Sequence, residues 1–86
     1  MSIEFTGEVI WVIGASSGIG ESLAQELSQQ GATLILSARR EEQLNELNDK
    51  LGGQHKVLPL DVSDNDAVVK AAQEIEEEFP VLNRII

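Results

Sequence analysis

The stretch that decides the fold is "VIGASSGIG", residues 12–20, where three glycines and two serines directly follow an apolar run. The glycines have the spacing Gly14-x-x-x-Gly18-x-Gly20. Upstream, residues 8–14 are apolar on both faces of a pleated strand, which is typical of a parallel sheet covered on both sides. The glycine-rich turn therefore follows a strand that we expect to be buried.

Helical spacing begins within this turn. The apolar residues recur every three to four positions and predict a stripe on one face of a helix, made of Ile19, Leu23, Ala24 and Leu27. Gly31 is placed to end the helix as its C-terminal cap. The turn thus joins a strand to an amphipathic helix.

Three more strands are predicted downstream, at residues 32–38, at 55–62 and from residue 82 to the end of the sequence. Pro59 weakens the second of these, because proline cannot donate to a sheet ladder. Two further helices lie between them. The resulting order β-α-β-α-β-α-β, with short connections, implies an α/β fold with a parallel sheet and right-handed crossovers.

Each of the two further helices has its own end signals. The first carries Leu44, Leu47 and Leu51 and closes at the Gly52-Gly53 pair. The second is predicted to open at Ser63, with Asp66 completing a Ser-x-x-Asp capping box, and to end at Pro80. Its apolar stripe comprises Val68, Ala71, Ala72, Ile75 and Phe79. The acidic residues Glu74, Glu76, Glu77 and Glu78 are interpreted as a solvated face.

The amino-acid composition excludes several classes of function. The 86 residues are enough for one small domain, and a net charge of −9 disfavours binding to nucleic acid or to an anionic membrane. The sequence has no cysteine, which excludes disulfides, thiolate catalysis and Cys-ligated zinc. We expect a cytoplasmic location, because neither a secretory signal nor a membrane-spanning run is recognisable. The single histidine, His55, is expected to lie exposed at a strand edge rather than to act as a catalyst or metal ligand.

The glycine-rich turn has the chemistry of a pyrophosphate site. Gly14 permits a tight turn, Gly18 lets the backbone approach an anion, and Gly20 lets the helix pack close to the sheet. Backbone N–H groups and the positive end of the helix dipole then face the anion, and Ser16 and Ser17 add hydroxyl donors. The alternative is a tight turn that binds nothing. The candidate residues are Gly14, Ser16, Ser17, Gly18, Ile19 and Gly20.

The end of the second strand indicates which dinucleotide is bound. NAD sites place an acidic residue there to hold the ribose 2′-hydroxyl, whereas this sequence has Ala38 followed by Arg39 and Arg40. Arginine binds a 2′-phosphate through a charge-assisted pair. The alternative, a solvated helix start, leaves two cations at the unfavourable end of a helix dipole. The pattern favours NADP(H), with Arg39 as the main contact.

The "LPLDVSD" segment closes the third strand. It places Asp61 at the carboxyl edge of the sheet, where the carboxylate could accept a hydrogen bond from the adenine amino group while Val62 lies against the ring. Asp61 could equally be a loop carboxylate near the next helix. The sequence leaves these two interpretations even.

These motifs resemble the short-chain dehydrogenase/reductase family. That family has Thr-Gly-x-x-x-Gly-x-Gly after its first strand, and here Ile13 stands in place of the threonine. The "ARR" and "LDVSD" segments are similar to those of its NADP-preferring members. The resemblance implies a Rossmann-type three-layer fold and hydride transfer between NADP(H) and an alcohol or carbonyl substrate. It also implies a homo-oligomer for a full-length enzyme.

The sequence departs from the family in what it lacks. The family's catalytic Ser, its Tyr-x-x-x-Lys pair and its Asn-Asn-Ala-Gly segment lie beyond the fourth strand; this sequence has no tyrosine, and Asn83 does not match that segment. We therefore interpret residues 1–86 as the N-terminal, NADP(H)-binding half-domain of a longer single-domain enzyme, cut within the fourth strand and carrying no catalytic residue. The alternative is a free-standing NADP(H)-binding module or sensor. A sugar-nucleotide epimerase relative would instead show Gly-x-x-Gly-x-x-Gly.

Overall fold

The computed structural model describes residues 6–79 and 81–86, so the predicted role of Pro80 lies outside the described residues. Helices and strands alternate as the sequence predicts. In chain order they are β1 (Val9–Ile13), α1 (Gly18–Gln29), β2 (Thr33–Ser37), α2 (Glu41–Lys50), β3 (Lys56–Val57), α3 (Asn65–Glu78) and β4 (Arg84–Ile85).

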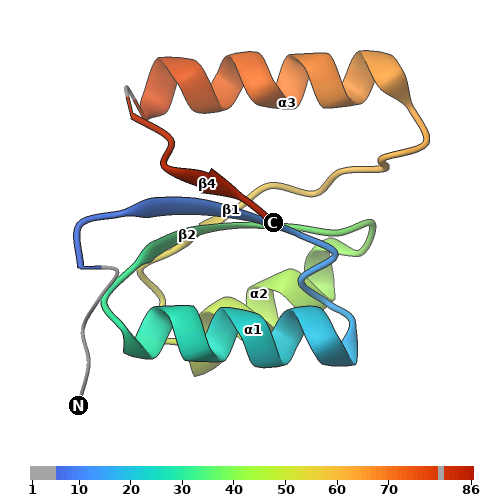
Figure 1. Ribbon diagram of the computed structural model, residues 1–86. Helices are drawn as coiled ribbons and strands as arrows, with labels where there is room; N and C mark the ends of the chain where they lie inside the picture. The colour runs from blue at the N-terminus through green and yellow to red at the C-terminus, as the bar shows by residue number, and fades with distance from the viewer. Residues whose placement is uncertain (1–5, 80) are drawn as a thin grey trace.

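The described strands form a four-stranded sheet in the order β3-β2-β1-β4, and each neighbouring pair is parallel. Helices α1 and α2 cover one face of this sheet, and α3 covers the other (Figure 1). The chain crosses from one face to the other after β3. The parallel sheet confirms the α/β fold predicted from the alternation of elements, and the three layers confirm the Rossmann-type arrangement that the family resemblance implies.

Two apolar clusters hold the layers together, one on each face of the sheet. The cluster under α1 and α2 is built around Ile10, Leu34 and Leu44, and the cluster under α3 around Trp11 and Ile75. Alternate residues of β1 thus serve opposite faces, as expected for a strand covered on both sides. The buried Trp11 indole N–H donates to the Ser37 hydroxyl at 2.8 Å, so this polar group is paired.

Strand β3 is shorter than the predicted strand at 55–62, because regular pairing covers only Lys56–Val57. The interruption coincides with Pro59, which has no N–H to donate. Hydrogen bonds to β2 and its extension nevertheless continue on both sides of the proline, from Leu58 N to Leu36 O at 2.9 Å and from Leu60 N to Ala38 O at 2.8 Å. The segment therefore still runs beside β2 to the carboxyl edge of the sheet.

The cap of α3 differs from the predicted one. Asp64 occupies the N-cap position, and its Oδ1 accepts from Ala67 N at 3.2 Å. Ser63 is engaged elsewhere: its backbone N–H and its hydroxyl both donate to Asp61 Oδ1, at 3.0 and 2.6 Å. The Ser63 capping box was therefore a wrong prediction, because the preceding aspartate competes for the serine.

The exposed position predicted for His55 is also wrong. Its side chain is buried, with 6% exposed. The ring accepts a hydrogen bond from Leu34 N at Nδ1 (3.0 Å), and Nε2 lies 3.1 Å from the Ser28 hydroxyl. The His55 backbone N–H donates to Asn48 Oδ1 at 3.0 Å. Burial lowers the pKa of the imidazole.

Ile19, the first residue of the apolar stripe predicted for α1, is not part of the buried face of the helix. Ala24 and Leu27 are buried as expected, but Ile19 is 87% exposed. Ile19 lies in the first turn of α1, directly after the glycine-rich turn.

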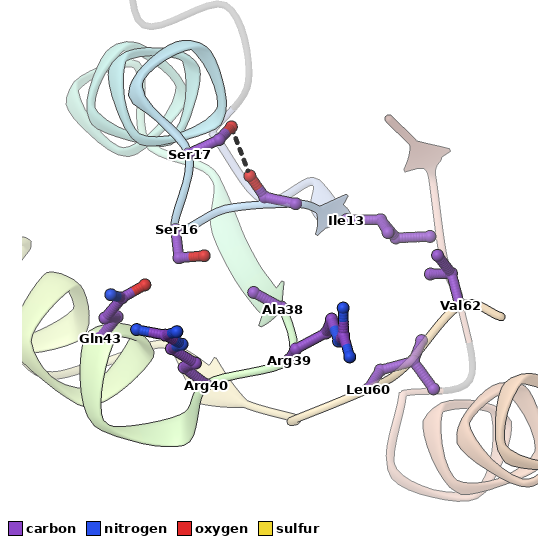
Figure 2. A pocket seen from close by; sticks show the side chains of 10 residues that line it. Ile13, Ser16, Ser17, Ala38, Arg39, Arg40, Gln43, Leu60 and Val62 are labelled. Atoms are coloured by element: carbon purple, nitrogen blue, oxygen red, sulfur yellow. Dashed lines mark hydrogen bonds between the residues drawn. The ribbon is translucent and has the colours of Figure 1, made fainter. Parts of the chain in front are cut away.

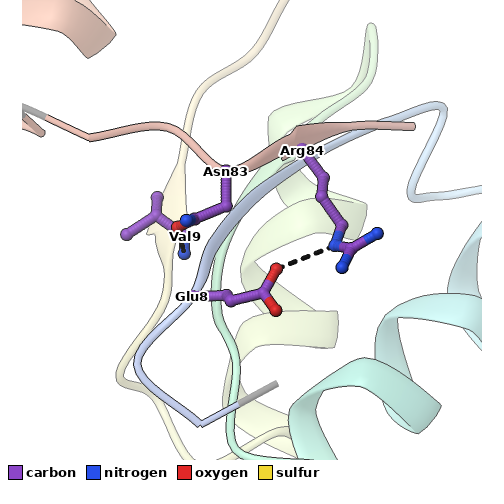
Figure 3. A network of polar contacts seen from close by, with 4 residues as sticks. All are labelled: Glu8, Val9, Asn83 and Arg84. Atoms are coloured by element: carbon purple, nitrogen blue, oxygen red, sulfur yellow. Dashed lines mark hydrogen bonds and ion pairs between the residues drawn. The ribbon is translucent and has the colours of Figure 1, made fainter. Parts of the chain in front are cut away.

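Strand β4 is fastened to β1 at the amino end of the sheet (Figure 3). Asn83 Oδ1 accepts from Val9 N at 2.7 Å, and Arg84 Nε donates to Glu8 Oε1 at 2.8 Å. Asn83 thus has a role in strand pairing.

The acidic residues near the end of α3 are exposed, as predicted, although Glu78 pairs with Lys56 at 2.9 Å. None of the helices among the described residues has the length and apolarity to cross a bilayer.

Candidate functional site

The glycine-rich turn lies at the carboxyl end of β1 and is tied to the end of β2. The amides of Gly14 and Ala15 both donate to Ser37 O, at 2.7 and 3.1 Å. Gly14 has a φ of 81°, a conformation that favours glycine. A Cβ on Gly20 would overlap the carbonyl oxygen of Gly14. The steric roles predicted for Gly14 and Gly20 are confirmed.

Ser17 is the N-cap residue of α1, and both hydrogen bonds of its hydroxyl are made within the turn. Its Oγ donates to Gly14 O at 2.9 Å and accepts from Gly20 N at 3.2 Å, so Ser17 acts as the helix cap rather than as a free donor. The amides of Gly18 and Ile19 make no hydrogen bond to any residue in 6–79 or 81–86. These two N–H groups, at the positive end of α1, are the donors that the turn leaves open to an anion.

Beside the turn is a cavity of about 390 Å³ (Figure 2). It is framed by the ends of β1 and β2, the first turn of α2 and the segment after β3. Its lining residues are Ile13, Gly14, Ser16, Ser17, Ala38, Arg39, Arg40, Gln43, Leu60 and Val62. The cavity lies at the carboxyl edge of the sheet, where open parallel α/β sheets bind their ligands.

The cavity brings together most of the residues singled out in the sequence, from segments far apart along the chain. Predicted site residues in its lining are Gly14, Ser16, Ser17, Arg39, Arg40 and Val62, whereas Gly18, Ile19, Gly20 and Asp61 are outside the lining. Gln43 and Leu60 also line the cavity, although neither is among the predicted site residues. In the sequence, Gln43 could have been noticed only as a neutral amide among the glutamates of α2. Leu60 could have been noticed only because it directly precedes Asp61.

Arg39 and Arg40 are both exposed at the mouth of the cavity. Arg40 is the N-cap residue of α2, but its side chain makes no capping hydrogen bond. The first turn of α2 carries Glu41 and Glu42, whose charges complement the helix dipole. The two guanidinium groups are therefore not explained by helix capping.

Asp61 lies between Leu60 and Val62 in the sequence, but unlike these two residues it is outside the cavity lining. The hydrogen bonds from the Ser63 hydroxyl and amide lower the pKa of the Asp61 carboxyl, and the positive charge of Arg39 lowers it further. The carboxylate is thus held ionised. Its Oδ1 is occupied by Ser63, a local turn that fits the loop-carboxylate interpretation and does not test the adenine contact.

Two open backbone N–H groups at the start of α1 lie near a largely apolar cavity that two arginines also line. These are the features that an elongated anionic ligand would require. Among the described residues, no three His, Asp or Glu side chains are gathered as a metal ion would require. The fold and site together define a dinucleotide-binding α/β protein.

Comparison with known proteins identifies the family. The family model for short chain dehydrogenases matches residues 8–86. The mouse (Mus musculus) protein named Dehydrogenase/reductase SDR family member 7 is 40% identical over 90 residues, covering 96% of this chain and 27% of its own length. The chain belongs to the short-chain dehydrogenase family. It spans about a quarter of the length of that curated relative.

Solved structures agree with this assignment. RhlG of Pseudomonas aeruginosa, determined as an NADP active-site complex, superposes with a TM-score of 0.87 at 27% identity, covering 96% of this chain and 33% of its own. A metagenomic short-chain oxidoreductase in complex with NADP has a TM-score of 0.88 at 30% identity, with coverages of 94% and 38%. Both therefore share the fold seen here.

Proposed function

We propose that this chain binds NADP(H) and forms the cofactor-binding segment of a short-chain oxidoreductase. That enzyme would transfer hydride between NADP(H) and an alcohol or carbonyl substrate. The observation that carries the proposal is Ala38 at the end of β2, followed by Arg39 and Arg40 at the mouth of the cavity. A carboxylate at position 38 would repel a 2′-phosphate, whereas the arginines attract one.

The other parts of the cofactor have matching positions. The open amides of Gly18 and Ile19 suit the pyrophosphate, because they combine two donors with the helix dipole. The apolar lining at Leu60 and Val62 suits the flat face of adenine, and we propose that Asp61, between them in the sequence, accepts a hydrogen bond from the adenine amino group. Each position is a proposal from the geometry of this chain.

The chain's own residues bind and orient the cofactor. When bound, the nicotinamide ring supplies or accepts the hydride. The reacting carbonyl oxygen also needs a proton donor, and the sequence contains no tyrosine to act as one. We therefore assign no catalytic residue to residues 1–86 and place the substrate site in the remainder of the longer enzyme.

The relatives support an enzyme rather than a free-standing binding module. The mouse relative is named a dehydrogenase/reductase, and two structural neighbours are described as complexes with NADP. A third neighbour, YwfH, with a TM-score of 0.87 at 25% identity and covering 91% of this chain and 35% of its own, is described as an NADPH-dependent reductase. These names describe those proteins, and they favour the same cofactor here.

The proposal is tested by titrating the chain with NADPH and with NADH and measuring both dissociation constants by calorimetry. We expect NADPH to bind at least about tenfold more tightly, since a hydrogen bond to a charged group contributes about 1.5–3 kcal/mol. Raised salt should reduce the difference, because the arginines are exposed. Equal affinities would contradict the assignment of NADP(H).

A further inference from the structure

We propose that Gln43 is a specificity-determining residue of this cavity, whose side-chain amide donates to the 2′-phosphate of the cofactor. The inference rests on the proposed NADP(H) function and extends it to a residue on α2. Neither the glycine motif nor the arginine pair includes this position. Three features of the structure support it: the orientation of α2, the partners of Gln43 in the cavity, and the charges around it.

The packing of α2 fixes where Gln43 lies. Leu44 is fully buried and Leu47 is 3% exposed, so these two residues anchor one face of the helix to the core. Gln43 is left on the neighbouring flank. Further residues of that flank, Glu46 and Lys50, line a second hollow of about 230 Å³ together with Glu21 of α1. The flank that carries Gln43 therefore faces α1 and its preceding turn.

Gln43 and Ser16 line both hollows. They therefore mark the boundary where the large cavity ends and the smaller hollow between the helices begins. In Figure 2 the Arg40 side chain extends toward Gln43, and Arg39 lies on the other side of Ala38. A phosphate next to Ala38 would have Arg39 on one side and Gln43 with Ser16 on the other.

The charges near the start of α2 also support a role for Gln43 in binding the phosphate. Gln43 is the third residue of α2, and the first two are Glu41 and Glu42. Helix stability alone would favour a third glutamate, because a carboxylate in the first turn complements the helix dipole. The sequence has a neutral amide at the position that lines the cavity. An amide offers two N–H donors and adds no negative charge beside a phosphate.

The test compares Gln43→Glu with the matched control Asn45→Asp. Both replace an exposed amide of α2 by a carboxylate, but Asn45 is outside the cavity lining. The probes are 2′,5′-ADP, which carries the 2′-phosphate, and 5′-AMP, which lacks it. Dissociation constants are measured by calorimetry on the whole chain, and circular dichroism verifies the fold. Gln43→Ala serves as a second variant that removes the donor without adding charge.

We expect Gln43→Glu to weaken 2′,5′-ADP binding at least about tenfold while 5′-AMP changes less than about threefold. Gln43→Ala should weaken 2′,5′-ADP selectively by a smaller factor, and Asn45→Asp should leave both affinities within about twofold. If Gln43 had only a structural role, neither substitution at position 43 would change the ratio of the affinities for 2′,5′-ADP and 5′-AMP. That result would overturn the inference while NADP(H) binding stands. If the parent chain does not prefer 2′,5′-ADP to 5′-AMP, the proposed function fails and the inference falls with it.

Discussion

At the scale of single residues, His55 joins three segments of the fold, two through its ring and one through its backbone. Its Nδ1 accepts from Leu34 N in β2 and its Nε2 faces the hydroxyl of Ser28 in α1, while its backbone N–H is bound by Asn48 of α2. A ring that accepts at Nδ1 must be unprotonated there. The native structure therefore requires the neutral imidazole.

This requirement predicts a pH dependence of stability. The unfolded chain binds a proton near the ordinary pKa of 6.5, whereas burial lowers the pKa of His55 in the folded state. The unfolded state then binds more protons, so the free energy of unfolding should be highest above about pH 6.5 and should fall as the pH passes below it. The decline should end below the lowered folded pKa. Urea unfolding at about pH 8 and about pH 5.5, followed by circular dichroism, measures the change.

The control is His55→Gln, which removes the only histidine in the sequence. This variant should be less stable than the parent at about pH 8 but should lose less stability on acidification. Identical pH profiles for the two proteins would show that His55 does not titrate as described.

At the scale of elements, the glycine-rich turn sets how closely α1 approaches β1. The two glycines at the start of the helix have different surroundings. A Cβ on Gly20 would overlap the backbone of Gly14, whereas a Cβ on Gly18 would meet nothing within 4 Å. Gly20 is thus required by packing within the fold, and Gly18 is not.

We expect Gly20→Ala to destabilise the chain by about 1–3 kcal/mol, because backbone must move to admit the methyl group. Gly18→Ala, the matched control, should change the free energy of unfolding by no more than about 0.5 kcal/mol. Urea denaturation of the two variants and the parent measures both values. Equal stabilities for the two variants would contradict the close packing of α1 against the turn.

The order of elements and the glycine turn could be predicted because they depend on local pattern. Apolar runs and glycine spacing locate a buried strand followed by a helix, and Gly31, with a φ of 91°, ends α1 as predicted. The errors arose where two local options compete or where burial depends on distant segments. Ser63 bonds to Asp61 instead of capping α3, and the burial of His55 depends on residues 7 to 27 positions away.

The candidate site was predictable to a similar extent. The motifs locate the residues at the ends of β1 and β2, because parallel strands bring their carboxyl ends to one edge. The cavity also includes Gln43 and Leu60, whose participation depends on the rotation of α2 and the path of the chain past Pro59. Pattern alone does not determine either.

At the scale of the whole molecule, the chain combines a cavity that we propose binds NADP(H) with no residue to which we assign a catalytic role. It spans 27% of the length of the mouse relative. We predict that the 86-residue chain alone has no dehydrogenase activity, because no tyrosine is present to donate the proton. The assay is NADPH oxidation at 340 nm, roughly the absorbance maximum of the reduced nicotinamide, with a panel of aldehydes and ketones. Steady oxidation that depends on an added carbonyl compound would refute this prediction.

The central claim is that the end of β2 selects NADP(H). It is tested most directly by the dissociation constants for NADPH and NADH in the parent, in Arg39→Ala and in Ala38→Asp. Arg39→Ala should weaken NADPH by roughly 10- to 100-fold, less if Arg40 compensates, and leave NADH nearly unchanged. Ala38→Asp should weaken NADPH further by repulsion and strengthen NADH through the ribose hydroxyl. Equal affinity of the parent for NADPH and NADH would contradict the claim.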